Sequence, residues 1–268
     1  MPVQKRYYQS DLTNRQWKIL KPLLPKAKSC PGKPGRPSSD LRMIINAILY
    51  LLKTGCQWRM IPNDYPPWST VHGYFRRWRK SGLWRKILDH LRKKERKRQG
   101  HKPDPSAGCI DSQSVKTTTQ GQEVGIDGGK WVKGRKRHIL VDTLGILLIV
   151  VVTSANTSDH TGLKALVSQY FKNGVNRLRK IWVDGGYSGT PLFQWVLNLK
   201  KTYQLLLDVV EKEGKGFHVI KHRWVVERTF SWLINFRRNS KDYEKLTQGS
   251  EAMLQIAMIH TLLKRYGS

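Results

Sequence analysis

The stretch KGRKRHILVDTLGILLIVVVTS, which runs from Lys133 to Ser154, predicts two β-strands joined at Leu144–Gly145. Aliphatic and β-branched residues fill both halves, and a glycine at the junction suits the tight turn of a hairpin. A shorter strand, GCIDSQSV at 108–115, precedes the pair. The central part of the chain is therefore expected to begin a β-sheet with three consecutive strands.

Helical and strand patterns alternate after the hairpin. Helices are expected at 159–171, 190–201, 222–238 and 250–266, and strands at 178–189 and 203–211. Three strands, then alternating helix and strand, then helices predict an α/β sheet flanked by helices.

The region before the sheet has a different pattern. Four short helices are expected at 10–25, 40–55, 68–82 and 83–98, and a Pro- and Gly-rich basic loop at 26–39. Consecutive short helices, one of them strongly basic, are similar to a helix-turn-helix arrangement. We expect a boundary between 96 and 108, with a helical DNA-binding domain at 1–100 and an α/β domain at 101–268.

Positive charge dominates the composition. The 268 residues include 49 Lys and Arg against 19 Asp and Glu, a net charge of +30. Residues 1–105 carry a net charge of +19 and residues 106–268 a net charge of +11. Such an excess favours a polyanionic partner, and we expect double-stranded DNA.

Cysteine usage and hydropathy indicate an intracellular setting. Cys30, Cys56 and Cys109 form an odd, scattered set with no CxxC pair, so we expect neither a disulfide framework nor a zinc site. The longest apolar run, Ile146–Val152, is too short to cross a bilayer, and the N-terminal residues lack the apolar core of a signal peptide. A cytoplasmic, nucleoid-associated location in a bacterium is expected.

Three of the scarce acids fall at informative positions. Asp111 lies in the strand at 108–115, Asp184 ends the strand before Gly185, and Glu227 lies in the helix at 222–238. Helical spacing places Glu227 with Trp224, Phe230 and other apolar residues, so we expect it on the buried side. Three acids on three elements can converge at one edge of an open α/β sheet.

Each acid also has an alternative role. Asp184 could form a turn, Asp111 could cap a loop, and Glu227 could pair with Arg223 one helical turn earlier. Two other acids have simpler roles: Asp142 is expected to form the hairpin turn and Asp159 to cap a helix. A cluster of carboxylates suits Mg²⁺, with Mn²⁺ as a substitute. Two such ions ~3.5–4 Å apart support phosphoryl transfer.

Four segments resemble DDE transposases of the bacterial insertion-sequence-five family. They are CIDSQSVKT, KGRKRHILVDTLG, VDGGYSG and WVVERTFSWLINFRRNSKDYE. DLTNRQWKILKPLLP and the segment from Gly55 to Trp84 resemble the helical domain that precedes catalysis in these proteins. The resemblance covers nearly the whole chain. It implies an RNase H-like catalytic domain in which Asp111, Asp184 and Glu227 are the catalytic, metal-binding triad.

One part of the family signature differs in this chain. Related transposases carry Tyr, Arg, the catalytic Glu and a later basic residue. Here Arg223 and Glu227 match, while Ile220 and Ile234 replace the Tyr and the basic residue. Arg237, Arg238 and Lys241 are therefore expected to contact DNA instead. The other expected DNA contacts are Arg223, the basic residues of the helix at 68–82 and those of the strand next to the Asp111 strand: Arg76, Arg77, Arg79, Lys80, Lys133, Arg135, Lys136 and Arg137.

The resemblance implies a transposase that binds the terminal inverted repeats of its element and catalyses metal-dependent cleavage and strand transfer. Joining two ends implies a homodimer or larger assembly on DNA. Two other classes stay open: a non-catalytic DNA-binding regulator, and a structure-specific nuclease without strand transfer.

Overall fold

The computed structural model describes residues 8–25, 39–172, 177–185, 190–210 and 224–266, with the backbone alone at 190–193. Helices make up the N-terminal part of the chain. They are α1 Asn14–Leu20, α2 Leu41–Thr54, α3 Trp68–Lys80 and α4 Leu83–Arg98, with short 3-10 helices at Lys21–Leu23 and Trp58–Met60.

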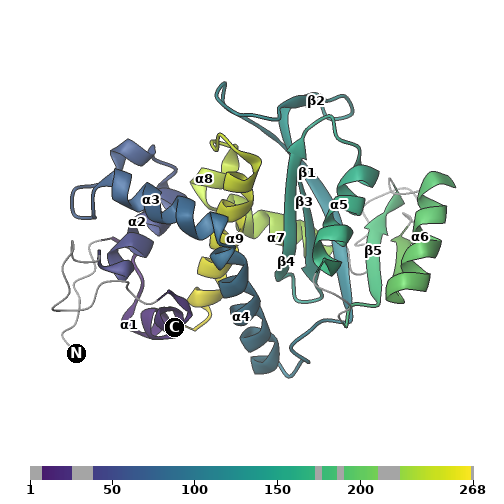
Figure 1. Ribbon diagram of the computed structural model, residues 1–268, viewed down its shortest axis with the longest axis horizontal. Coiled ribbons are helices and arrows are strands. Elements are labelled where there is room, and N and C mark those ends of the chain that lie inside the picture. The colour runs from purple at the N-terminus through teal and green to yellow at the C-terminus, as the bar shows by residue number, and fades with distance from the viewer. Residues whose placement is uncertain (1–7, 26–38, 173–176, 186–189, 211–223, 267–268) are drawn as a thin grey trace.

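A mixed sheet with further helices follows (Figure 1). Its strands are β1 Ala107–Lys116, β2 Gly125–Asp127, β3 Val132–Asp142, β4 Leu147–Ser154, β5 Lys180–Asp184 and β6 Leu206–Val210. The later helices are α5 Asp159–Phe171, α6 Thr190–Tyr203, α7 Trp224–Ile234, α8 Arg237–Ser240 and α9 Thr247–Lys264.

The strand order confirms the expected RNase H-like sheet. β4, β3 and β1 are antiparallel neighbours, and β5 and β6 continue from β1 as parallel strands. The short strand β2 pairs with β3 on the edge away from β1 and is missing from the sequence-based prediction. Only three residues form it, which is too few for a strand pattern to be visible.

Local signals explain where several elements begin and end. Thr13 and Gln16 form a capping box at α1, and Asp40 caps α2 by accepting a hydrogen bond from the Arg42 N–H. Gly55 ends α2 with φ +74°, a conformation that suits glycine. Ser158, rather than Asp159, caps α5.

Asp142 forms the hairpin turn, as predicted. Its Oδ1 accepts hydrogen bonds from the N–H groups of Leu144 and Ile146. Its Oδ2 lies 2.6 Å from Nη1 of Arg96 on α4, in a buried ion pair. The turn is thereby tied to the last N-terminal helix.

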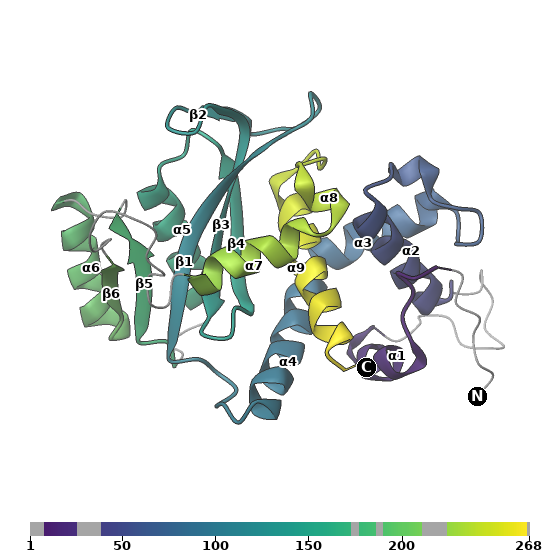
Figure 2. The same cartoon turned by 180° about the vertical axis from the view of Figure 1, so that it is seen from behind.

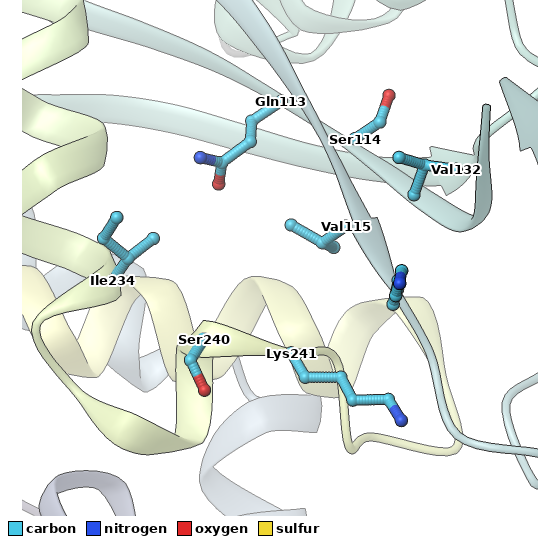
Figure 3. Close-up of a pocket in the computed structure, with 8 residues that line it drawn as sticks. Gln113, Ser114, Val115, Val132, Ile234, Ser240 and Lys241 are labelled. Carbon is cyan, nitrogen blue, oxygen red and sulfur yellow. The ribbon is translucent and has the colours of Figure 1, made fainter. Parts of the chain in front are cut away.

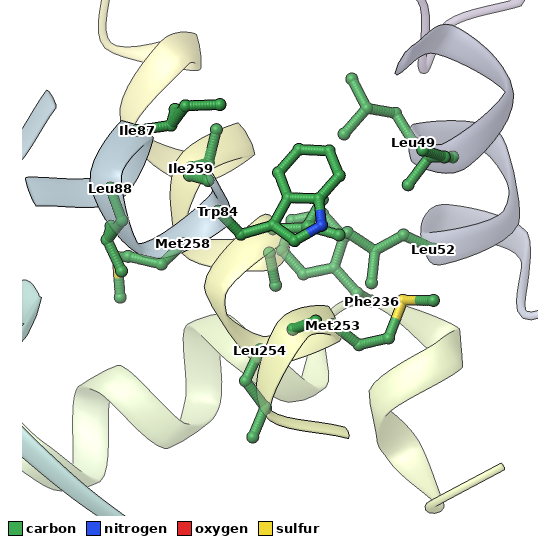
Figure 4. Packing of buried hydrophobic residues seen from close by; sticks show 14 of the residues in the cluster. Leu49, Leu52, Trp84, Ile87, Leu88, Phe236, Met253, Leu254, Met258 and Ile259 are labelled. Carbon is green, nitrogen blue, oxygen red and sulfur yellow. The ribbon is translucent and has the colours of Figure 1, made fainter. Parts of the chain in front are cut away.

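Two apolar clusters cover the two faces of the sheet. The smaller joins Ile110 and Leu140 to α5 residues such as Leu163 and Leu166. The larger joins the opposite face to α7 and α9 and continues into α2, α3 and α4. Figure 4 shows α9 residues, among them Met253 and Met258, packed with side chains of the N-terminal helices. α9 therefore lies between the N-terminal helices and the sheet.

Candidate active site and DNA-binding surface

Asp111 and Asp184 lie on adjacent parallel strands. β1 and β5 pair in the register Ala107↔Lys180 through Cys109↔Trp182. Asp111 and Asp184 each come two residues after the last of these pairs, at equivalent positions on their strands. Residues two apart on a strand share a face, so the two carboxylates lie on the side of Cys109 and Trp182.

That side is the one that α7 covers. Cys109 belongs to the larger apolar cluster with Val226 and Phe230 of α7, and Trp182 packs against the same cluster. Figure 2 shows the N-terminal end of α7 lying across β1. Glu227 is in the first turn of that helix.

Hydrogen bonds fix α7 to the β3–β4 turn. Thr229 Oγ1 donates to the Gly145 carbonyl at 2.8 Å, and Arg228 Nη2 donates to the Leu144 carbonyl at 3.1 Å. The Arg228 guanidinium also lies between the rings of Trp224 and Trp232, 4.4 and 4.6 Å from their centroids. The orientation of the helix that carries Glu227 is thus set by the sheet itself.

The expectation that Glu227 lies on the buried side of its helix is wrong. Glu227 is exposed, as are Trp224, Ser231 and Ile234, which share its face. The buried stripe of α7 consists of Val225, Val226, Thr229, Phe230 and Leu233. Trp and Ile suggested a buried face, although single apolar residues are common on protein surfaces.

The three acids do not lie close enough together to form a preorganised metal-binding site. Within the described residues, no group of three or more His, Cys, Asp or Glu side chains lies close enough to hold a metal ion. Asp111 Oδ1 accepts a hydrogen bond from the Ser112 N–H at 2.7 Å. Carboxylates at equivalent positions of two adjacent strands, with a third on the covering helix, are nevertheless of the ligand type that a divalent cation prefers.

A pocket of about 520 Å³ lies along the C-terminal half of β1 (Figure 3). Gln113 and Val115 line it from β1, and Ile234, at the end of α7, faces them. Lys116 and Lys241 add positive charge. Sequence reasoning missed Gln113 and Lys116; the alternation of the Asp111 strand would have pointed to Gln113, which shares its face.

Arg135 and Arg137 were expected to contact phosphate, and this expectation is wrong. β3 does neighbour the Asp111 strand, but both side chains are buried against residues 239–245. Arg135 Nη1 lies 3.2 Å from Asp242 Oδ2, and Arg137 Nη1 donates to the Asn239 carbonyl at 2.7 Å. Burial lowers the pKa of Arg137 to about 10, with Asp242 opposing the shift. These guanidinium groups are internal structural contacts.

The other two basic residues of this strand differ from each other. Lys133 is exposed, whereas Lys136 is buried on the opposite face, 3.4 Å from Asp159 and 3.5 Å from Asp127. Lys136 is therefore paired within the protein, and its predicted role as a surface DNA contact is wrong. On the same face, burial lowers the pKa of His138 to about 4, and its Nε2 lies 3.0 Å from Thr153 Oγ1.

The predicted DNA contacts that follow α7 also differ in their exposure to solvent. Arg238 is buried, with its guanidinium 2.8 Å from Glu244 Oε1 and bonded to the Cys56 carbonyl, so its assignment as a DNA contact is wrong. Arg237 is exposed, and Lys241 is partly exposed beside the pocket. Arg223 lies outside the described residues.

The basic residues of α3 lie on its outer side. Arg76, Arg77 and Lys80 are exposed and Arg79 is half-buried, while Trp78 packs into the core. The Arg77 guanidinium stacks 4.3 Å from the Tyr74 ring centroid. α3 therefore presents a cationic surface to solvent.

In the described residues, no helix is long and apolar enough to span a membrane. An RNase H-like sheet with carboxylates on two adjacent strands, packed against a Glu-bearing helix, is typical of enzymes that cut and join nucleic-acid strands. The family model described as "Transposase DDE domain" matches residues 102–262, more than half of the chain. The chain therefore belongs to the DDE transposases, enzymes that act on DNA with divalent metal ions.

Other comparisons agree with this assignment. The model described as "Putative transposase of IS4/5 family" matches residues 12–88. A "Putative transposase for insertion sequence element IS402" from Burkholderia cepacia is 30% identical over 129 residues, 46% of this chain and 60% of that protein. An "Insertion element IS402 uncharacterized 16.2 kDa protein" from the same organism is 33% identical over 112 residues, 41% of this chain and 75% of that protein.

Proposed function

We propose that this transposase binds the terminal inverted repeats of its own insertion element, cleaves the DNA there and transfers the 3′ ends into target DNA. The observation that supports this best is the β1–β5 pairing, because Asp111 and Asp184 each follow its last pair by two residues and α7, which carries Glu227, packs against that face. A regulator that only occupied the ends would need no such arrangement of acids.

We assign Asp111, Asp184 and Glu227 to metal binding and catalysis. Mg²⁺, with Mn²⁺ as a substitute, suits carboxylate ligands together with substrate phosphates. When bound, two such ions supply the charge that activates an attacking oxygen and stabilises the leaving oxygen. Like charges on neighbouring strands repel, so a bound cation would favour the approach of these carboxylates.

The pocket along β1 suits the DNA strand next to the cleaved bond. Lys116 and Lys241 lie at its wall, and Gln113 offers an amide for hydrogen bonding (Figure 3). Lys241 takes the role that a basic residue at the Ile234 position would otherwise have. Arg237 and Lys133 are exposed and extend the positive surface.

Residues 1–100 are assigned to recognition of the DNA ends and residues 101–268 to catalysis. The exposed Arg76, Arg77 and Lys80 on α3 would contact phosphates, and Arg79 is half-exposed beside them. Such contacts release counterions, so affinity for end DNA should fall steeply with salt concentration. Bringing two ends together implies a homodimer or larger assembly on DNA at the bacterial nucleoid.

A single assay separates the candidate functions. The protein is incubated with Mg²⁺, a linear donor that carries the ends of its own element, and a supercoiled target; donors with scrambled ends and reactions with excess chelator are the controls. End-specific joined products are expected. Cleavage without joining would indicate a nuclease, and binding without either product would indicate a regulator.

A further inference from the structure

Trp131 is the most exposed large apolar side chain in the described part of the chain, with 85% of its surface accessible. It lies in the turn between β2 and β3, and β2 lies at the upper edge of the molecule in Figures 1 and 2. Ile126, on β2, is also 56% exposed. An aromatic ring that is this exposed to solvent contributes little to the core, and its exposure indicates a role in binding.

The turn that presents Trp131 is held by a buried aspartate. Asp127 Oδ1 accepts hydrogen bonds from the N–H groups of Gly129 and Lys130 at 3.1 and 3.2 Å. Its Oδ2 accepts a hydrogen bond from Ser114 Oγ at 2.5 Å and lies 3.5 Å from Lys136 Nζ. The hydrogen bond from Ser114, more than any other contact, lowers the pKa of Asp127 and keeps it ionised. The turn is thus anchored to β1 and β3.

The backbone at Trp131 is strained. Its φ is +54°, in the left-handed region that a bulky side chain rarely adopts. Glycine would avoid this cost, and two glycines occupy 128 and 129 in the same turn. A Trp that is both strained and exposed points to a function rather than to packing.

The surroundings of Trp131 fit a nucleic acid. Lys130 and Lys133 are exposed on either side of it in the sequence, and the next residue, Val132, lines the pocket along the C-terminal half of β1. A second copy of a chain with net charge +30 would bring like charges together at this point. DNA would bring phosphates to the lysines and base faces to the ring.

We propose that Trp131 is a stacking platform for a nucleobase that has left the double helix, while Lys130 and Lys133 bind the neighbouring phosphates. This inference rests on the proposed function, in which the pocket receives the DNA strand beside the cleaved bond. An indole ring stacks on any base, so the contact selects unpaired or distorted DNA rather than a sequence.

The test compares short duplexes that carry one 2-aminopurine, either paired or in a single-base bulge. Stacking on an aromatic ring quenches the emission of this base. Wild type is expected to bind the bulged duplex about tenfold more tightly than the paired one, with quenching. Trp131→Ala should lose both the preference and the quenching, and Trp131→Phe should keep most of each.

Several controls make the result decisive. Trp131→Gly also removes the ring, but glycine adopts a positive φ without strain. Its melting temperature should therefore be no lower than that of wild type, while the preference for the bulged duplex is lost. Leu197→Ala, a change at another exposed apolar residue, should behave as wild type. A folded Trp131→Ala that keeps both preference and quenching would overturn the proposal. The proposal would also be overturned if Trp131→Ala changed the oligomeric state of the protein without DNA and left the base preference unchanged. The β2–β3 turn would then contact another copy of the chain.

Failure of the proposed function gives a different pattern. Wild-type protein that does not cleave its end DNA with Mg²⁺ would refute the proposed activity, whichever way the bulge preference comes out. Wild-type protein that cleaves but binds paired and bulged duplexes equally would refute the stacking role alone.

Discussion

Two buried guanidinium groups on β3 hold residues 239–245 against the sheet. Arg135 donates to the carbonyls of Gln122, Glu244 and Lys245 and pairs with Asp242. Asp242 also accepts a hydrogen bond from Ser250 Oγ. A charged network of this kind is costly to break, because removing one partner leaves the other buried and uncompensated.

Arg135→Ala should therefore lower the free energy of unfolding by about 3–5 kcal/mol, measured by chemical denaturation. Lys133→Ala, at an exposed position on the same strand, should change it by less than about 0.5 kcal/mol. Wild-type stability of Arg135→Ala, together with weaker DNA binding, would contradict the internal role and return Arg135 to the DNA surface.

These residues also show what a strand pattern can predict. Alternation correctly places Arg135 and Arg137 on one side and Lys136 on the other. Which side is open to solvent depends on residues 239–245, about a hundred positions later in the chain. The same limit applies to Glu227, because helical spacing identifies its neighbours but not which face the sheet covers.

At the scale of elements, the contact between α9 and β4 includes a half-buried carboxyl group, that of Glu251. Glu251 Oε1 accepts a hydrogen bond from the Val152 N–H at 3.0 Å. Burial raises the pKa of Glu251 to about 7, and nearby Glu123 adds to the shift, while the Val152 N–H opposes it. The folded protein thus favours the protonated form, and its stability should fall as the pH rises from about 4.5 through 7.

Glu251→Gln should remove this dependence, because the amide keeps the acceptor and carries no charge. At pH 8 the variant should be more stable than wild type by about 2–3 kcal/mol, and at pH 4.5 the two should nearly coincide. Thermal melting of both proteins across this range measures the difference. The contribution of buried histidines to the pH dependence cancels, because both proteins contain them. A constant difference at all pH values would show that Glu251 does not titrate in this window.

The elements themselves were largely predictable from sequence, but their register was not. Strands around Asp111 and Asp184 follow from local apolar patterns and the glycine after Asp184. The pairing of Cys109 with Trp182 joins segments more than seventy residues apart. Whether the two acids lie side by side therefore depends on a non-local contact that no local pattern encodes.

At the scale of the whole molecule, α9 joins the N-terminal helices to the sheet. Leu254, Met258 and other α9 side chains are buried among residues of both regions (Figure 4). Gln16 Nε2 donates to the Leu263 carbonyl at 3.3 Å, and Arg265 pairs with Glu95 at 3.2 Å. The N-terminal helices thus use the C-terminal helix as part of their core.

A fragment of residues 1–100 should therefore fail to fold cooperatively by itself. Each large apolar side chain that loses its cover costs about 1.5–3 kcal/mol, and several such losses exceed a typical domain stability of ~5–15 kcal/mol. Circular dichroism during thermal unfolding measures this, and addition of a peptide spanning 246–268 should restore a cooperative transition. A sharp transition of the fragment alone would show that residues 1–100 form an independent domain.

The central claim is that Glu227 is a metal ligand and not merely a surface carboxylate paired with Arg223. The most direct test is Mg²⁺-dependent cleavage of end DNA by Glu227→Gln, in protein shown by melting to be folded and by titration to bind that DNA. Glu251→Gln, the same chemical change away from the site, is the matched control. Loss of a correctly placed ion removes several kcal/mol of transition-state stabilisation, so cleavage should fall by more than about 100-fold in Glu227→Gln and stay near wild type in the control. Near-normal cleavage by folded, DNA-binding Glu227→Gln would contradict the account and remove Glu227 from the catalytic site.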